Sequence, residues 1–221
     1  MKNLKETLLR LVILLVGLTI AHLGVTLFLL SDLGADPFNV LVQGLFRLSE
    51  STLGWSVLSH GRVHIAVCLL IILLLLIVDR SYVRLGTLVC MALGGPIIDM
   101  FSLLLAPLFA LMSSPVPRYL MLALGCVILA FGMTMVIRSE AGTGPNDLVA
   151  VVLSDKLKKK FSVLRVIVDF SFVLIGALLG GIFGPGTLIC AFLVGPVAGV
   201  FMPVNAKLVS RILRRCGVEA A

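Results

Sequence analysis

Charged residues are scarce in this sequence, and their scarcity excludes a soluble protein. Asp, Glu, Lys and Arg make up 13% of the 221 residues and hydrophobic residues make up 60%, whereas an ordinary globular domain has about 25% charged and about 45–50% apolar residues. The mean hydropathy is +1.18. Because a soluble domain of this size could not bury so many apolar side chains, the composition indicates an integral membrane protein.

Sequence motifs of several function classes are also absent. There is no GxxxxGK[ST] or GxGxxG loop, no HExxH motif and no Ser/His/Asp set, which argues against an energised pump, a metalloprotease or a hydrolase. The five cysteines show neither CxxC nor Cys/His spacing, and four of them lie in apolar runs. We expect them to pack in the interior rather than bind a metal, and we predict no cofactor and no enzymatic activity.

What the sequence does contain is a series of apolar runs near the roughly 20 residues that a spanning helix needs. The runs are continuous rather than alternating, which excludes a transmembrane β-barrel. The first run, from Leu11 to Leu30, exceeds the roughly 7–15 residues of a signal-peptide core and is followed by no cleavage site, so we expect a retained helix. The predicted fold class is an all-α polytopic membrane protein.

The sequence also contains an internal repeat. A shift of 108 positions matches 9 of the 31 residues from 10 to 40, and a shift of 100 matches 8 of the 16 residues from 86 to 101. The matches include glycines, prolines, threonines and a cysteine in the same order, which a biased composition does not readily produce. We predict a single transmembrane domain, 1–221, with repeats at about 10–106 and 118–205 and a basic cytoplasmic tail at 206–221. The first repeat is longer, and we place its additional residues between Ser49 and Arg62.

Each repeat is predicted to contain four helices, the second of them short and preceded by a break. The predicted helices are 11–30, 37–48, 63–79 and 86–106 in the first repeat, and 119–138, 145–157, 162–181 and 186–205 in the second. The breaks contain Gly34 and Pro37 in the first repeat and Gly142, Gly144 and Pro145 in the second. Because proline is favourable at the first helical position, each break leads directly into a short helix.

The basic residues indicate the orientation but not the number of spans. Fifteen of the 18 lysines and arginines fall on one side whether all eight helices span or the two short ones do not, so the positive-inside rule predicts cytoplasmic termini. From Asn146 to Lys156 a helix covers about 15 Å, half of the roughly 30 Å hydrocarbon core. We therefore expect the short helices to be re-entrant or interfacial, and the two repeats, with three spans each, to be inverted.

The breaks and two later pairs of motifs resemble the bacterial YczE/YyaS/YitT family of membrane proteins. The matching segments are Ser31–Asn39, Ala141–Asp147, Gly86-Thr87 with Gly95-Pro96, and Gly186-Thr187 with Gly195-Pro196. The resemblance covers nearly the whole chain. It implies this fold and, less directly, solute transport across a bacterial cytoplasmic membrane, because members of the family are commonly labelled as transporters.

Ionisable side chains within the predicted spans are candidates for binding a solute or ion, since each costs at least about 2.5–3.5 kcal/mol to insert. Asp99 replaces Gly199 of the other repeat, and this asymmetry makes it the first candidate proton carrier. His22 could be functional, or it could be structural and held by one hydrogen bond to a neighbouring helix. Asp169 could be functional, or it could pair with Arg165 one turn earlier.

Polar residues also gather at the starts of the two short helices. Asn39 and Asp147 occupy equivalent positions two residues after the break proline, and Asn146 precedes Asp147. Free backbone N–H groups and the positive end of the helix dipole suit an anion there. The alternative is structural, because Asp36 and Asp147 could cap these helices at about 0.5–2 kcal/mol each.

The leading functional hypothesis is a transporter or exporter of a small solute, with proton coupling left open. The alternatives are a non-transporting accessory protein that assists another membrane component and, third, an enzyme acting on lipid. A transporter would place Asp99, Asp147 and Asp169 around one internal cavity, whereas an accessory protein would bury them against a partner. The expected partners are the lipid bilayer and the solute, and a homo-oligomer is left open. The basic cluster Lys156–Lys160 suits anionic headgroups better than nucleic acid.

Overall fold

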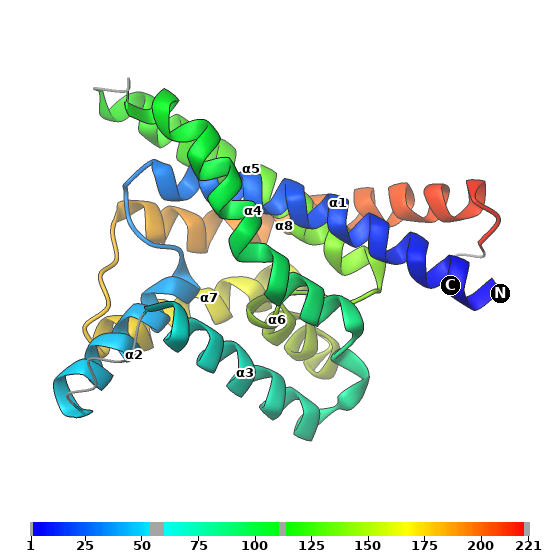
Figure 1. The fold of residues 1–221 in the computed structure, drawn as a ribbon, viewed down its shortest axis with the longest axis horizontal. Helices are drawn as coiled ribbons and strands as arrows, with labels where there is room; N and C mark the ends of the chain where they lie inside the picture. Colours follow the sequence, from blue (N-terminus) through cyan, green and yellow to red (C-terminus); the bar gives the residue numbers. More distant parts are fainter. Residues whose placement is uncertain (1, 54–59, 111–113, 219–221) are drawn as a thin grey trace.

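The computed structural model describes residues 2–53, 60–110 and 114–218, and their regular structure is entirely helical (Figure 1). The additional residues predicted for the first repeat include 54–59, which lie outside the described residues. The elements are α1 (Lys2–Leu30), α2 (Pro37–Leu53), α3 (His60–Val78), the 3-10 helix η1 (Arg80–Tyr82), α4 (Leu85–Ala110), α5 (Pro115–Ser139), α6 (Pro145–Leu157), α7 (Phe161–Leu178) and α8 (Pro185–Arg215).

Five helices are long and apolar enough to span a bilayer: α1 from Leu4, α4, α5, α7 and α8. In α3, Val63–Val78 is a shorter apolar stretch. The described parts of α2 and α6 belong to neither group. Large apolar side chains point outward, with Ile77 and Leu103 each 82% exposed and Leu178 79% exposed, as expected for surfaces in contact with lipid. The all-α membrane fold predicted from the sequence is confirmed.

The most extensive helix packing in the described structure is between α1 and α5, which run antiparallel and meet at four glycines. A Cβ added to Gly24 would lie 2.5 Å from the carbonyl oxygen of Gly125, and one added to Gly17 would lie 3.0 Å from that of Gly132. Only glycine permits this approach of two backbones, which is how helices pack tightly where lipid supplies no hydrophobic drive. The two helices therefore form the central pair of the bundle.

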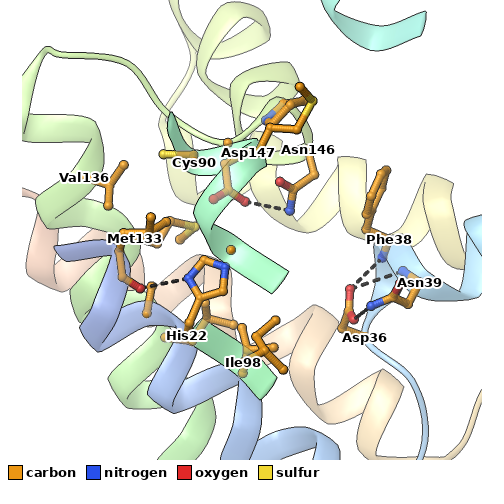
Figure 2. A pocket seen from close by; sticks show the side chains of 18 of the residues that line it. His22, Asp36, Phe38, Asn39, Cys90, Ile98, Met133, Val136, Asn146 and Asp147 are labelled. Carbon is orange, nitrogen blue, oxygen red and sulfur yellow. Dashed lines mark hydrogen bonds between the residues drawn. The ribbon is translucent and has the colours of Figure 1, made fainter. Parts of the chain in front are cut away.

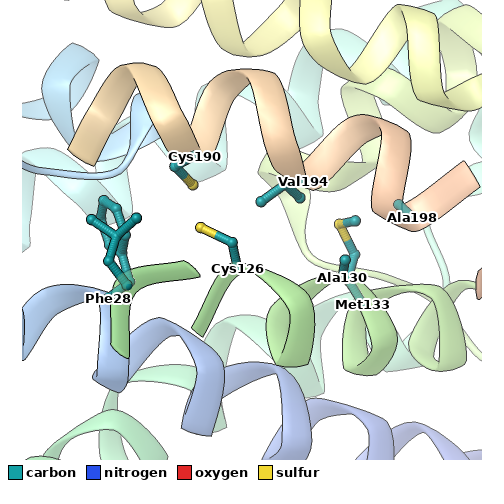
Figure 3. Close-up of a cluster of buried hydrophobic side chains, with 8 residues drawn as sticks. Phe28, Cys126, Ala130, Met133, Cys190, Val194 and Ala198 are labelled. Atoms are coloured by element: carbon teal, nitrogen blue, oxygen red, sulfur yellow. The ribbon is translucent and has the colours of Figure 1, made fainter. Parts of the chain in front are cut away.

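The helix α8 packs on the other side of α5 and completes the largest cluster of buried side chains (Figure 3). Cys126 of α5 and Cys190 of α8 lie in this cluster, next to Val194 and Met133. Cys68 and Cys90 are also buried, and Cys216 alone among the five is exposed. Four of the cysteines are therefore packing residues, as the sequence indicates.

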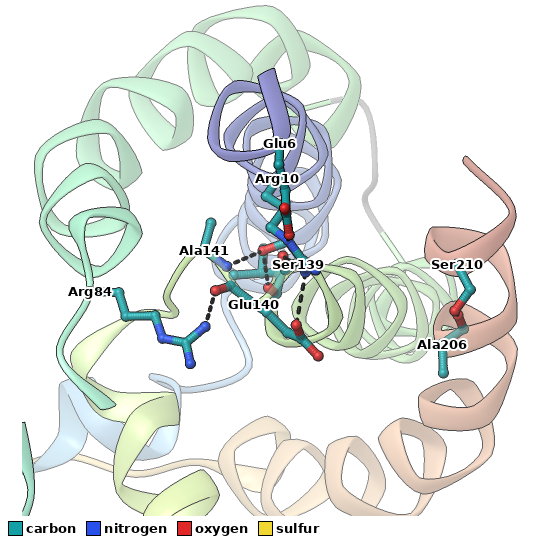
Figure 4. Close-up of polar contacts among 9 residues, drawn as sticks. Glu6, Arg10, Arg84, Ser139, Glu140, Ala141, Ala206 and Ser210 are labelled. Carbon is teal, nitrogen blue, oxygen red and sulfur yellow. Dashed lines mark hydrogen bonds and ion pairs between the residues drawn. The ribbon is translucent and has the colours of Figure 1, made fainter. Parts of the chain in front are cut away.

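Polar contacts define two ends of the bundle. At the terminal end, Arg10 pairs with Glu140 at 2.8 Å and donates to the carbonyl of Ser139, and Arg84 donates to the carbonyl of Glu140 (Figure 4). Lys5 donates to the carbonyl of Cys216 there, so both termini share this end. At the opposite end, Arg118 lies 3.9 Å from Asp32 and Arg47 donates to the carbonyl of Gly180.

Several helices are longer than predicted. The helix α8 continues through residues 206–215 instead of ending at 205, α1 begins at Lys2 instead of 11, and α2 continues to Leu53 instead of 48. In α8 the continuous apolar run ends near residue 205, but Val209 and Leu213 beyond it pack on Ile13 of α1. The helical part of the basic tail is therefore held by an apolar stripe that an average over the segment hides.

Alanine at Gly24 should lower the free energy of unfolding by about 1–3 kcal/mol, because its Cβ would lie 2.4 Å from the backbone nitrogen of Leu129. Gly95→Ala is the matched control. Apart from its chain neighbours and the nearby backbone of its own helix, a Cβ there meets no described atom within 4 Å. Alanine at Gly95 should therefore cost less than alanine at Gly24, even though Pro96 follows it and reduces its helix preference. Unfolding by titration with a denaturing detergent measures both. Equal stability of the two variants would contradict the glycine contact between α1 and α5.

Candidate functional site

A cavity of about 220 Å³ lies inside the bundle, and the starts of both short helices line it (Figure 2). Asp36 and Asn39 reach it from the start of α2, and Asn146 and Asp147 from the start of α6. The remaining lining comes from six other helices and is largely apolar, with Leu18, Leu129, Met91, Met133 and Ile98 among the contributors. The cavity is thus a mainly apolar space with a few polar groups, which is typical of small-molecule sites.

The start of α2 is held by a cap and by the last helix of the chain. The carboxylate of Asp36 accepts hydrogen bonds from the backbone N–H groups of Phe38 and Asn39, at 3.1 and 3.2 Å, and from the Asn39 amide. The preceding break has Gly34 at φ 139°, a conformation that favours glycine. Gly186 of α8 donates its N–H to the carbonyl of Leu33 at 2.8 Å. Asp36 therefore caps α2, as the structural alternative predicted.

The start of α6 is built in the same way but without a side-chain cap. Gly142 has φ 140°, and Gly86 of α4 donates its N–H to the carbonyl of Ala141 at 2.9 Å. The N-cap residue Gly144 has φ −58° and an ordinary backbone. Of the two glycines in this break, only Gly142 has a backbone conformation that favours glycine. The carboxylate of Asp147 accepts from the Asn146 and Arg165 side chains instead of capping the helix.

Arg165 is the centre of the charged groups at the cavity. Its guanidinium donates to Asp147 and, at 2.9 Å, to Asp169. Asp147 also accepts from the Asn146 amide at 3.1 Å. Arg165 and Asp169 are 7% and 1% exposed, and the second carboxylate oxygen of Asp169 has no hydrogen-bond partner among the described residues. The expected Asp169 pair exists, and it extends to Asp147 on the cavity wall.

Two histidines complete the polar lining. The Nδ1 of His22 is hydrogen-bonded to the carbonyl of Leu18 in its own helix, at 2.8 Å. The structural alternative predicted a hydrogen bond to a neighbouring helix instead. Its Nε2 faces Gly94, where an added Cβ would lie 2.7 Å away. His64 packs edge-on against Phe38, with ring centroids 5.2 Å apart. Gly94 therefore makes the room that the His22 ring occupies.

Asp99 does not join these groups. It is exposed on α4, and its neighbour Ile98 lines the cavity instead. Of the three acidic residues expected to converge, Asp147 lines the cavity and Asp169 lies behind it through Arg165. The sequence does not predict which face of α4 packs against the bundle, because α4 is apolar on all sides and has no helical periodicity of hydrophobic residues.

Sequence reasoning missed His64 and treated Arg165 only as a possible ion-pair partner of Asp169. Both are ionisable residues within predicted spans, so the insertion cost applied to the acidic residues would have found them. Cys68, Cys90 and Cys190 also line the cavity, and no sequence signal marked them. The described residues contain no group of three or more His, Cys, Asp or Glu side chains placed to hold a metal.

The fold and the cavity define an α-helical polytopic membrane protein with an internal polar site. The chain belongs to a family described as "Family of unknown function (DUF6198)", which matches residues 8–203. An uncharacterized protein of Haemophilus influenzae is 31% identical over 199 residues, covering 89% of this chain and 84% of its own length. Similarity to YczE and YyaS of Bacillus subtilis confirms the resemblance to that family.

Two Bacillus subtilis proteins extend this similarity. The uncharacterized membrane protein YczE is 25% identical over 213 residues, covering 96% of this chain and 94% of its own length. The uncharacterized protein YyaS is 28% identical over 190 residues, covering 86% of this chain and 90% of its own. No solved structure matches. The alignments therefore support the same membrane architecture over nearly the whole chain.

Gly142→Ala should lower the yield and melting temperature of the protein, because the left-handed backbone costs about 1 kcal/mol or more for alanine and the new Cβ would lie 2.4 Å from the Thr87 nitrogen. Gly144→Ala is the matched control, since its backbone is ordinary and the nearest contact is the Asn146 side chain at 3.0 Å. Purification in detergent and a thermal melt compare them. If Gly142→Ala is as stable as Gly144→Ala, the break does not depend on the backbone of Gly142.

Proposed function

We propose that this protein is a non-enzymatic transporter of a small organic solute in the bacterial cytoplasmic membrane. The observation that carries the proposal is that two short helices, outside the group of spanning helices, both begin at one internal cavity. Many secondary transporters bind solutes near the middle of the membrane at the ends of such discontinuous helices. The polar groups at Asp36, Asn39, Asn146 and Asp147 then form the solute site.

Reciprocal contacts support an inverted repeat. The 108-residue shift exchanges the pair Gly24 and Gly125 with the pair Gly132 and Gly17, and both pairs pack. In the same way, Gly186 donates to the carbonyl at the first break while Gly86 donates to the carbonyl at the second. Each half therefore ties the break of the other with its own last helix. Such an exchange of roles is expected of two copies related by a twofold axis in the membrane plane.

The polar contacts at the two ends support six spans with both termini in the cytoplasm. Arg10 and Arg84 lie at the terminal end, and Arg118 lies at the opposite end. In the eight-span alternative, Arg10 and Arg84 would be on opposite sides of the membrane. Arg165 leaves the count because it is at the cavity, so 14 of the 18 basic residues are assigned to the cytoplasm under the six-span arrangement.

The charges at the cavity favour a singly positive solute. Asp36, Asp147 and Asp169 supply three negative charges when ionised, and Arg165 supplies one positive charge. The starts of α2 and α6 add about half a positive charge each. With neutral histidines the site has a net charge of about −1, which is costly in a low-dielectric interior unless it is neutralised. The apolar lining suits an organic cation, such as a small protonated amine.

Proton exchange follows from the same balance. A monocation and a proton each neutralise the site, so binding of one displaces the other. Asp147 is the best-placed carrier, because it lines the cavity while Asp169 is sealed behind Arg165. The protein would then couple proton entry to export of the cation. The proton carrier is therefore Asp147 rather than Asp99, which lies on the outside of α4.

The accessory-protein alternative has one observation in its favour. Asp99 is a carboxylate exposed on a helix that is long and apolar enough to span the bilayer. A partner helix that offers a hydrogen-bond donor would lower the cost of placing it in lipid. Under this alternative, a membrane partner would co-purify with the wild type but not with Asp99→Leu. Neither protein would bind a solute.

The solute class is tested by thermal stabilisation of the purified protein with choline and methylammonium, and with acetate as the anionic comparison. At about 100 times its Kd, a bound cation should stabilise the fold by about 2.7 kcal/mol. The stabilisation should be lost in Asp147→Asn, because the amide removes the negative charge at the cavity wall. It should persist in Asp155→Asn, which changes an exposed residue on the same helix.

Stabilisation by acetate alone would contradict the charge argument. Equal stabilisation of the wild type and Asp147→Asn by a cation would contradict the site. If neither cation nor acetate stabilises the wild type while a co-purifying membrane partner depends on Asp99, the accessory-protein alternative is favoured.

A further inference from the structure

The two repeats differ in how their last two helices pack. In the second repeat, α7 and α8 lie along each other: a Cβ at Gly195 would be 2.6 Å from Val166, and Phe170 and Phe192 stack edge-on with centroids 4.6 Å apart. In the first repeat, the described parts of α3 and α4 scarcely touch. They are joined through η1 and separate away from it (Figure 1).

The equivalent positions in α3 and α4 can be assigned from the repeat. A shift of 101 aligns the buried residues of α3 (Val63, Val67, Cys68, Ile72 and Leu75) with those of α7 (Leu164, Val168, Asp169, Val173 and Gly176). A shift of 100 aligns α4 with α8 through the Gly-Thr-Leu-x-Cys match. Gly195 and Val166 therefore correspond to Gly95 and Ile65, and Phe192 and Phe170 correspond to Ala92 and Leu69.

These equivalent residues in the first repeat are exposed and do not pack on each other. Gly195 is buried, whereas Gly95 is exposed and a Cβ there would meet no described atom within 4 Å. Ile65 is 52% exposed and Leu69 is 45% exposed. The cavity reaches this gap, since His64 and Cys68 of α3 and Gly95 and Ile98 of α4 line it. The gap thus borders the proposed solute site.

We propose that α3 and α4 close on each other as α7 and α8 do, with Gly95 packing on Ile65 and Ala92 on Leu69, and that this closure accompanies separation of α7 from α8. The inference rests on the proposed transport function and assigns its moving parts. The closed first repeat seals the cavity toward the end that holds Arg118, and the opened second repeat exposes it toward the terminal end. Each state is the other with the repeats exchanged.

Closure also gives Asp99 an environment. Its equivalent in α8, Gly199, lies against Ser162 in the first turn of α7. The same packing brings Asp99 to the N-terminal end of the described part of α3, the end at which the helix dipole favours a carboxylate. Asp99 therefore favours the closed state, and the asymmetry between Asp99 and Gly199 biases the two states relative to each other.

Cysteine cross-linking tests this exchange in the full chain with the five native cysteines replaced. The pair Leu69→Cys and Ala92→Cys reports closure of α3 on α4, and the pair Phe170→Cys and Phe192→Cys reports the packed α7 and α8. Each pair alone should cross-link with a short bifunctional thiol reagent. With all four cysteines present, the doubly cross-linked fraction should be at least about fivefold below the product of the single yields, as expected for coupled states.

Asp99→Asn should reduce cross-linking of the 69–92 pair and leave the 170–192 pair unchanged or increased, whereas Asp155→Asn should change neither. The proposal is overturned if the 69–92 pair fails to cross-link in folded protein, or if both cross-links form independently in the same molecules. Choline stabilisation is measured on the same variants without cross-linker. If the two cross-links do not exclude each other but choline still stabilises the protein, the closure of α3 on α4 is rejected and the cation site is kept. If the cross-links exclude each other but choline does not stabilise the protein, the cation site alone is rejected.

Discussion

Backbone groups that leave a helix inside the bundle need hydrogen-bond partners from the protein, and this requirement organises the structure. Lipid cannot supply such partners. The carbonyl groups of Leu33 and Ala141, at the two breaks, are each satisfied by a glycine near the start of a distant helix, α8 or α4. The left-handed glycines Gly34 and Gly142 allow the chain to turn at these points. Because of these ties, α2 and α6 can begin deep in the bundle, and the polar groups at their starts meet at one cavity.

The charges at the cavity depend on the same arrangement. Arg165 can serve both Asp147 and Asp169 only because the start of α6 is held against α7. A single guanidinium between two carboxylates leaves one negative charge in excess, and Asp36 is already engaged at the start of α2. The scaffold therefore places an incompletely balanced charge in an apolar cavity. Such an imbalance is expensive for stability alone and is consistent with binding a cation or a proton.

Local chemistry in the sequence predicted the helices well and the cavity partly. The start of α6 at Pro145 and its end at Leu157 match the prediction because proline and the basic segment after it are local signals. Asn39, Asn146 and Asp147 were found for the same reason, whereas Asp36 was expected only to cap α2. Asp99 was misplaced, because an all-apolar helix such as α4 does not reveal which face packs. The extension of α8 was missed, because its support from Ile13 comes from a residue about 200 positions earlier in the sequence.

The central claim is that the starts of α2 and α6 form one water-accessible cavity. Asn39→Cys and Asn146→Cys, each in a background without native cysteines, test it by their reaction with a charged, membrane-impermeant thiol reagent added to whole cells. Arg118→Cys serves as the outside reference and Leu104→Cys as the lipid-facing one. We expect the cysteines introduced in α2 and α6 both to react from the side that labels the outside reference, and choline to protect both, while the lipid-facing cysteine does not react. Labelling of only one of the two, or protection of only one of them by choline, would contradict a shared cavity.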